Sequence, residues 1–342
     1  MSSSESNVDP QEPRENEYTV GWICALQEEY EVACKMLDRR FKGPRMAHPN
    51  EDNTYEFGQI SDHYVVIGCL PFGDYGTNSA AAVAKDMVRS FPKLRFALLV
   101  GIGGGAPTRK DDIRLGDVVV GAGKGVHGGV IQLDAVKRYK SVDGSLSTQL
   151  WRHLNGPPNV LLGALPKIQE RYNDPDEVDK IAQNMERMSN RPEFERPSDD
   201  RLYRASYPHQ GGSDCENCDA EELVTRVERA VTHRVVKVHY GTIGSSNSLM
   251  KMVDERELYA NDPDLRILCF EMEAAGLVNT VPCLVIRGIC DYADSHKNDD
   301  WHNYAALAAA AYAKELLDNL RAEKVTEQPG WGSVLDKGTL MR

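Results

Sequence analysis

The chain has 342 residues, of which 41% are hydrophobic and 27% charged, and its formal net charge is −12. This length allows one large domain or two smaller ones with a buried core, while the acidic balance argues against a protein that mainly grips a nucleic-acid backbone. No apolar run approaches the ~20 residues that span a bilayer, and the polar N-terminus lacks a leader pattern, so we expect a cytoplasmic protein with neither a membrane nor a nucleic-acid partner.

Strand and helix patterns alternate along the chain between two polar ends. Residues 1–16 predict a disordered tail, and residues 324–342 predict a C-terminal tail. Continuous apolar runs predict strands buried on both faces at 18–26, 54–60, 63–71, 95–101, 117–121, 234–243, 267–271 and 282–290. Helices are predicted at 27–38, 77–90, 246–259, 272–279 and about 301–321. This alternation indicates an α/β layered domain over 17–323 with a parallel or mixed sheet.

One segment interrupts the alternation. Residues 140–232 are rich in Pro, Asn, Asp, Glu and Arg and lack the apolar spacing of the flanking elements. We expect an insertion, partly helical and partly loop, that lies over one edge of the core. A loop-rich segment of this length inside a compact domain is usually functional or disordered.

A glycine-rich run follows the strand predicted at 95–101. The sequence LVGIGGGAP begins at Leu99, and glycine lets backbone N–H groups approach a ligand closely. The run lacks the Lys-Ser/Thr pair of a phosphate-binding P-loop. Gly103 and Gly104 therefore fit either a ligand loop or a tight turn at the end of a strand.

Two acids occupy the junction FEMEAAG, where the strand predicted at 267–271 passes into a helix. Ligands of open α/β sheets bind at this end of the strands, and a carboxylate there can accept two hydrogen bonds from a vicinal diol. Glu271 and Glu273 fit that role. They also fit a structural role, because the helix dipole favours acids at a helix N-terminus.

The last predicted strand ends in RGICD. Arg287 and Asp291 at the rim of an apolar strand cost desolvation free energy unless they are paired or used. A carboxyl group in such a place can act as an acid near neutral pH. A structural ion pair is the alternative.

Two further strand-to-helix junctions carry polar side chains. In ALQEE, Glu28 and Glu29 stand in the first turn of a helix, where the helix dipole already favours acids. In IGSSNS, Ser246 and Asn247 resemble a helix cap. Neither motif indicates chemistry by itself.

Most of the eight cysteines lie in apolar stretches, as free thiols of an intracellular protein do. Cys215 and Cys218 are the exception and lie near His209 in a polar segment. One Cys-x-x-Cys pair with one histidine is an incomplete zinc site, because structural zinc takes four ligands. We therefore expect two free thiols and no metal, with these three residues as the weaker zinc alternative.

Taken in order, ALQEE, VGIGGG with RLGDVVV, FEMEAAG and RGICD resemble the nucleoside phosphorylase/nucleosidase superfamily, and most nearly its 5′-methylthioadenosine/S-adenosylhomocysteine nucleosidases. The similarity runs from about residue 18 to about residue 320 outside the insertion. The chain also looks like the fungal branch, whose domain occurs alone or fused to immune-receptor-like modules. The resemblance implies a three-layer α/β/α sandwich around a mixed, partly barrel-like sheet, no cofactor, and a homo-oligomer.

The resemblance also implies roles at one site. Asp291 would protonate or hydrogen-bond N7 of a leaving purine, while Glu29, as general base, and Arg287 would hold the attacking water. Glu273 would bind the 2′- and 3′-hydroxyl groups of the ribose. The remaining residues implied or expected to line the site are Ile102, Gly103, Gly104, Ser246, Asn247, Phe270, Glu271 and Met272. Such a pair of acids on opposite sides of a sugar suits cleavage through an oxocarbenium-like transition state.

The implied activity is hydrolysis of purine ribonucleosides such as adenosine, inosine and guanosine. Phosphorylases of this superfamily carry a serine in the glycine-rich loop, at the position of Ile102, and Glu29 would repel phosphate. The related nucleosidases carry that serine too, so here Arg287 or a backbone N–H group would have to hold the water. The alternatives are a phosphate-dependent purine nucleoside phosphorylase and a catalytically degenerate nucleoside-sensing module.

Overall fold

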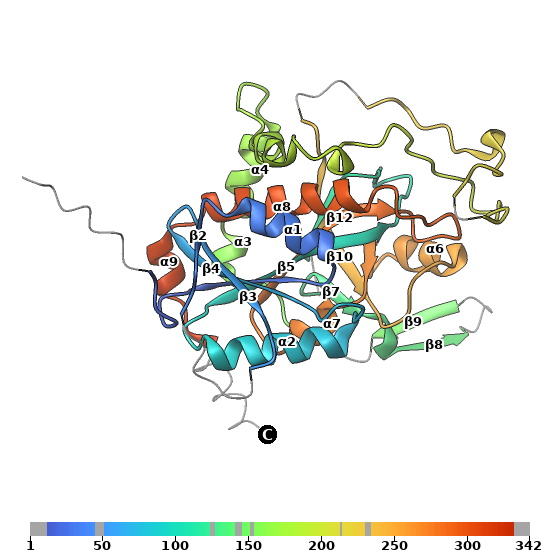
Figure 1. The fold of residues 1–342 in the computed structure, drawn as a ribbon. Helices are drawn as coiled ribbons and strands as arrows, with labels where there is room; N and C mark the ends of the chain where they lie inside the picture. Colours follow the sequence, from blue (N-terminus) through green and yellow to red (C-terminus); the bar gives the residue numbers. More distant parts are fainter. Residues whose placement is uncertain are drawn as a thin grey trace, which may run out of the picture.

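A mixed ten-stranded sheet forms the centre of the computed structural model, which describes residues 12–44, 51–123, 127–140, 146–150, 154–212, 214–229 and 234–331 (Figure 1). Its strands are β1 (Val20–Cys24), β2 (Arg39–Phe41), β3 (Tyr55–Ile60), β4 (His63–Cys69), β5 (Phe96–Gly105), β6 (Val118–Gly121), β7 (Val130–Gln132), β10 (Val238–Ser245), β11 (Ile267–Glu271) and β12 (Cys283–Asp291). A separate hairpin joins β8 (Val136–Lys140) to β9 (Leu146–Leu150). Each of β1, β5, β6, β11 and β12 is buried along its whole length, as the apolar runs predict.

The sheet closes on itself at one end. Its strand order is β11-β10-β6-β12-β5-β1-β4-β3-β2, with β7 beside β10. Most of the central pairs are parallel, but β11 also pairs antiparallel with β5, where Cys269 lies opposite Gly105 and Phe270 opposite Gly104. Strands β5, β12, β6, β10 and β11 thereby form a barrel-like ring. The predicted mixed, partly barrel-like sheet is confirmed.

Helices cover both faces of the sheet and give three layers (Figure 1). On one face, α1 (Gln27–Met36) packs beside α8 (His302–Asp318), and on the other α2 (Thr77–Ser90) packs beside α7 (Ala274–Leu277). Helix α8 is rich in alanine because it is buried on nearly every side, between the sheet and the insertion. The predicted α/β/α sandwich is confirmed.

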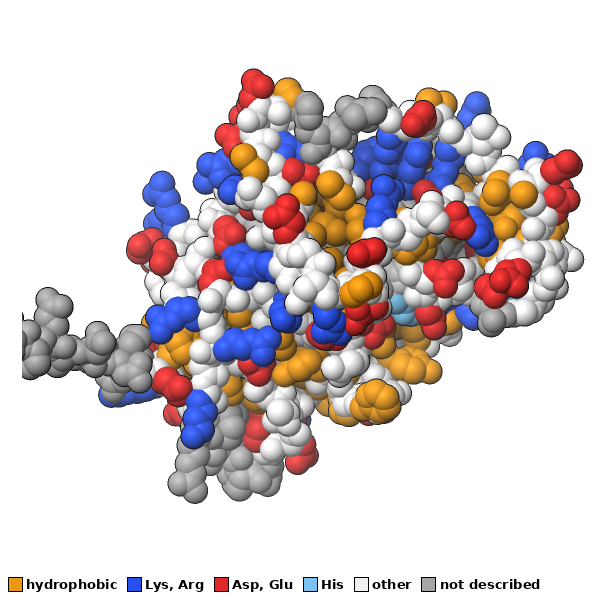
Figure 2. Space-filling view, turned by 45° about the horizontal axis from the view of Figure 1, so that its top comes forward, with side chains coloured by type: hydrophobic (Ala, Val, Ile, Leu, Met, Phe, Trp, Pro, Cys, Tyr) orange, Lys and Arg blue, Asp and Glu red, His pale blue; other side chains and the backbone are white. Residues whose placement is uncertain are grey.

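The insertion packs over α8 and α1 (Figure 1). It contains α3 (Asn159–Leu162), α4 (Leu165–Asn173) and α5 (Lys180–Met185), followed by a long loop-rich stretch. Arg187 donates to the carbonyl groups of Lys35, Met36 and Leu37, which the end of α1 leaves without helical partners. On the face shown in Figure 2, acidic and basic side chains of the described residues are intermixed.

Several boundaries differ from the predictions. The predicted helix 246–259 is wrong at its start, because α6 spans Val253–Asn261. The hydroxyl group of Ser246 bonds with the backbone of Ser248, a local contact that competes with helix formation. At the C-terminal end, α9 (Ala322–Thr326) is followed by Trp331, which is buried. Residues 1–11 and 332–342 of the predicted tails lie outside the described residues.

No helix among the described residues has both the length and the apolar character needed to cross a bilayer.

Candidate active site

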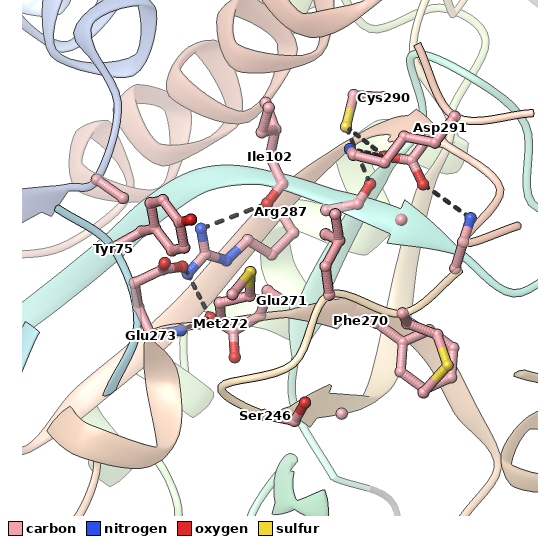
Figure 3. A pocket seen from close by; sticks show the side chains of 18 of the residues that line it. Tyr75, Ile102, Ser246, Phe270, Glu271, Met272, Glu273, Arg287, Cys290 and Asp291 are labelled. Atoms are coloured by element: carbon pink, nitrogen blue, oxygen red, sulfur yellow. Dashed lines mark hydrogen bonds and ion pairs between the residues drawn. The ribbon is translucent and has the colours of Figure 1, made fainter. Parts of the chain in front are cut away.

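A cavity of about 350 Å³ opens where β1, β5, β10, β11 and β12 end. Figure 3 shows Asp291 and Cys290 on one side of it and Arg287 with Glu273 on another. The sequence-predicted residues that line the cavity are Glu29, Ile102, Gly103, Gly104, Ser246, Phe270, Glu271, Met272, Glu273, Arg287 and Asp291. The carboxyl ends of neighbouring strands meet at one edge of a sheet, and this brings together side chains that are distant in the sequence.

Asn247 is the predicted site residue that the structure does not place in the cavity wall. Its side-chain oxygen accepts hydrogen bonds from the backbone N–H (3.0 Å) and hydroxyl (2.9 Å) of Thr77, at the first turn of α2. Its own backbone N–H donates to Asp134. Asn247 thus supports the β10 loop from behind the cavity.

Glu29 enters the cavity from the first turn of α1. Its Oε2 accepts hydrogen bonds from the backbone N–H groups of Ala25 (2.7 Å) and Leu26 (3.1 Å), and its Oε1 accepts one from Ile102 (2.8 Å). Burial raises the pKa of Glu29, although the Arg287 guanidinium and the three N–H groups act to lower it. An ionised carboxylate accepts about four hydrogen bonds, so one acceptor site remains open.

Arg287 lies at the centre of an acidic cluster with Glu271 and Glu273. Its Nη2 is 2.5 Å from Glu271 Oε2 and 3.2 Å from Glu273 Oε2, and its Nη1 donates to the carbonyl group of Ile102 at 3.4 Å. Glu271 also accepts hydrogen bonds from the backbone N–H groups of Glu273 and Ala274, at the start of α7. Arg287 itself is 1% exposed, and its guanidinium is paired with Glu271 and Glu273 instead of facing solvent.

Glu273 is a buried acid beside Arg287. Burial, together with the nearby Glu271 and Glu29, raises its pKa to about 7 against the opposing effect of Arg287. Its Oε1 accepts a hydrogen bond from the backbone N–H of Gly76 at 3.2 Å. Glu273 can therefore gain or lose a proton near neutral pH.

The glycine-rich run forms the end of strand β5, so it is neither a loop nor a turn, although Gly103 and Gly104 line the cavity. Its glycines allow charged side chains to approach the strand. A Cβ atom at Gly101 would overlap Glu29 Oε1 and lie 2.5 Å from Arg287 Nη1, and one at Gly104 would lie 2.6 Å from Asp291 Oδ1. The lack of side chains at these two positions makes room for the acids of the cavity.

Asp291 ends β12 and is paired with Lys297. Its Oδ2 is 2.5 Å from Lys297 Nζ, and its Oδ1 accepts a hydrogen bond from the backbone N–H of Ala293 at 2.7 Å. Burial lowers the pKa of Lys297, but the electrostatic effect of the neighbouring Cys290 and Asp291 raises it by a larger amount. The net shift is therefore upward. The base-side acid expected from the sequence is therefore one half of an ion pair.

Lys297 is among the cavity residues that the sequence predictions miss, together with Tyr75 and His302. All three lie outside the motifs, in loops or at a helix start, where no apolar spacing marks them. A lysine six positions after Asp291 is the only sequence signal for this ion pair. His302 lies 3.3 Å from Glu28, and this contact lowers the pKa of the Glu28 carboxyl group.

The cysteine pair lies away from the cavity. One ring nitrogen of His209 and the sulfur atoms of Cys215 and Cys218 lie within 4.8 Å of one another, and none of these residues lines the cavity. Among the described residues, this is the group of histidine, cysteine or acidic side chains with the spacing for a metal ion.

Comparisons with known proteins agree with this fold. A family model described as the phosphorylase superfamily matches residues 19–320. A nucleotide-binding leucine-rich repeat (NLR)-like protein of Hyaloscypha variabilis is 43% identical over 304 residues, which are 88% of this chain and 29% of that protein. This chain thus spans less than a third of that relative's length.

Solved structures show the same fold at low sequence identity. The 5′-methylthioadenosine/S-adenosylhomocysteine nucleosidase of Helicobacter pylori gives a TM-score of 0.55 at 14% identity, over 89% of this chain and 100% of that one. The futalosine hydrolase of the same organism gives 0.52 at 14% identity, over 89% and 99%. A 5′-methylthioadenosine/S-adenosylhomocysteine nucleosidase of Neisseria meningitidis gives 0.52 at 16% identity, over 88% and 99%. With a family match that covers most of its length and a shared fold, this chain belongs to the phosphorylase superfamily.

Proposed function

We propose that this protein is a purine nucleosidase, which hydrolyses the N-glycosidic bond of purine ribonucleosides such as adenosine, inosine and guanosine to free base and ribose. The observation that carries the proposal is that Glu29 and Asp291 line one cavity from different strand ends. Glu29 contacts β5 at Gly101 and Asp291 contacts it at Gly104, three residues and roughly 10 Å further along the strand. A sugar and its base fit between two such groups.

Three acids of the cavity would have different roles in the reaction, according to their positions. On the sugar side, Glu29 has a raised pKa and one open acceptor site, which suits a base that removes a proton from water. On the base side, Asp291 is placed to protonate or hydrogen-bond N7 of the leaving purine, with Lys297 as its ion-pair partner. Glu273 accepts hydrogen bonds from the ribose hydroxyl groups. The general acid–base catalysis by Glu29 and Asp291 contributes typically about 10²–10⁴-fold to the rate.

Water suits this cavity better than phosphate does. Three carboxyl groups, those of Glu29, Glu271 and Glu273, surround the single guanidinium of Arg287. A phosphate dianion would meet this negative charge, while Arg287 and Lys297, the Arg and Lys side chains among the described lining residues, are already paired with acids. Ile102 lines the same wall and offers no hydroxyl group. The hydrolase names of the Helicobacter pylori proteins of the same fold add support.

A nucleoside panel tests the proposal. Purified protein is incubated with adenosine, inosine, guanosine, 5′-methylthioadenosine and the pyrimidine nucleoside uridine, each with and without inorganic phosphate. We expect base release from the purine nucleosides at rates that phosphate does not increase, and none from uridine. Release that requires phosphate would establish a phosphorylase instead.

A sensing role is the second candidate, because the relative from Hyaloscypha variabilis is an NLR-like protein of which this region is only a part. A sensor would bind nucleosides without cleaving them. The presence of Glu29, Glu273, Arg287 and Asp291 in one cavity favours catalysis. Calorimetric binding of inosine without release of hypoxanthine over hours would favour the sensor.

A further inference from the structure

The loop that carries Cys215 and Cys218 has the composition and geometry of a metal site. Two sulfur atoms and one imidazole nitrogen lie within 4.8 Å of one another, although the three residues span ten positions of the chain. We propose that His209, Cys215 and Cys218 bind one zinc ion, with a water molecule as its fourth ligand, and that this ion fastens the insertion to the wall of the active site.

The Cys-x-x-Cys segment forms a turn. The backbone N–H of Cys218 donates to the carbonyl group of Cys215 at 3.1 Å, which curls the four residues and turns both sulfur atoms toward His209. Cys215 is buried and Cys218 is half-buried. Two thiolates with one imidazole favour Zn²⁺ over the hard cations Mg²⁺ and Ca²⁺, which prefer oxygen ligands.

The imidazole of His209 is held as metal-bound histidines usually are. Its Nε2 lies 2.7 Å from the carbonyl oxygen of Asp214, and its Nδ1 accepts a hydrogen bond from the backbone N–H of Gly211 at 3.2 Å. These contacts place the proton on Nε2 and the lone pair on Nδ1. A backbone carbonyl that orients the other ring nitrogen is the common outer contact of a zinc-bound histidine, and zinc at Nδ1 would replace the weaker Gly211 contact.

A buried imidazole, that of His296, lies beside this loop. His296 is 8% exposed, and its ring nitrogens make no hydrogen bond among the described residues, although Nδ1 lies 3.6 Å from Asp294 Oδ1. Its ring stacks on Tyr203 at 4.1 Å and meets the edge of His209 at 5.5 Å.

The same contacts connect the loop to the active site. The backbone N–H of His209 donates to the hydroxyl group of Ser295 at 3.1 Å, and the thiol of Cys215 lies 3.9 Å from the carbonyl oxygen of His296. The next residue, Lys297, is the partner of Asp291. Zinc at the loop would hold residues 295–297 in place and with them the base-side wall of the cavity. The zinc site does not depend on which nucleoside reaction the cavity carries out.

Metal analysis of the full chain tests the proposal. Protein purified without chelator should contain about one zinc per chain by mass spectrometry of the metal. Cys215→Ser and Cys218→Ser should lose nearly all of it, and His209→Ala most of it. Cys69→Ser is the matched control, since Cys69 is also a free thiol but lies outside the loop, and it should keep the wild-type content.

A second measurement on the wild-type chain covers the case in which the variants fail to fold. Co²⁺ added to chelator-treated protein should give a thiolate-to-cobalt charge-transfer band, and Zn²⁺ should protect Cys215 and Cys218 from alkylation in peptide mapping. Wild-type protein without bound zinc, without the cobalt band and without protection would overturn the proposal. A disulfide between Cys215 and Cys218 in freshly purified protein would overturn it too.

Discussion

Glu273 should make nucleoside binding depend on pH around neutrality. Burial among other acids raises its pKa to about 7, whereas a ribose diol donates two hydrogen bonds and is bound by the ionised carboxylate. If only the ionised form binds, the dissociation constant at a given pH is inversely proportional to the ionised fraction. Affinity should then improve by about tenfold between pH 6 and pH 8, or about 1.4 kcal/mol.

Calorimetry with a C-nucleoside, whose carbon–carbon glycosidic bond resists hydrolysis, measures this effect without turnover. The Glu273→Gln variant is the control, because its amide has nearly the shape of the acid but does not titrate. It should bind more weakly at pH 8 and show little change between pH 6 and pH 8. An affinity of the wild-type protein that is flat over this range, or a slope that persists in the variant, would refute the reasoning.

Three further changes should separate the roles of the cavity residues. Asp291→Asn should lower kcat for inosine by about 10²–10⁴-fold but hardly affect 4-nitrophenyl riboside, whose leaving group needs no proton; equal losses on both substrates would exclude an acid role. Gly101→Ala should cost about 10²-fold in kcat/KM, because its Cβ would displace Glu29 and Arg287, and wild-type kinetics would show that their positions do not matter. For Glu273, a pKa raised from 4.5 to about 7 means that the folded state retains a proton that the unfolded chain has lost. The free energy of unfolding of the wild type therefore falls as pH rises through this window. The Tm of Glu273→Gln minus that of the wild type should therefore increase from pH 5 to pH 8, and a constant difference would contradict the shifted pKa.

The sequence predicts the parts of the fold that depend on local pattern. Helix α2 and strand β11 have the predicted bounds, because continuous apolar or amphipathic spacing marks them. The acids of the cavity could be predicted because each follows a buried strand. The partly barrel-like sheet was expected only from the family resemblance, since the pairing of Phe270 with Gly104 joins residues far apart in the chain and leaves no local signal.

The missed features of the site are tertiary as well. The ion pair of Asp291 with Lys297 depends on the path of a loop, and no periodicity encodes that path. Asn247 follows a strand like the other site residues, yet its side chain turns to the first turn of α2. The role of the glycines in β5 emerges only when the acids packed against them are known. Sequence motifs thus indicate which residues meet, while the packing decides which of their groups face the ligand.

The sugar product formed from inosine in excess inorganic phosphate tests the central claim most directly. The proposed roles, with Asp291 as the acid on the base side and Glu29 as the base on the sugar side, predict ribose alone. Ribose 1-phosphate as the product would contradict the account, since phosphate would then have entered a space that three carboxyl groups surround.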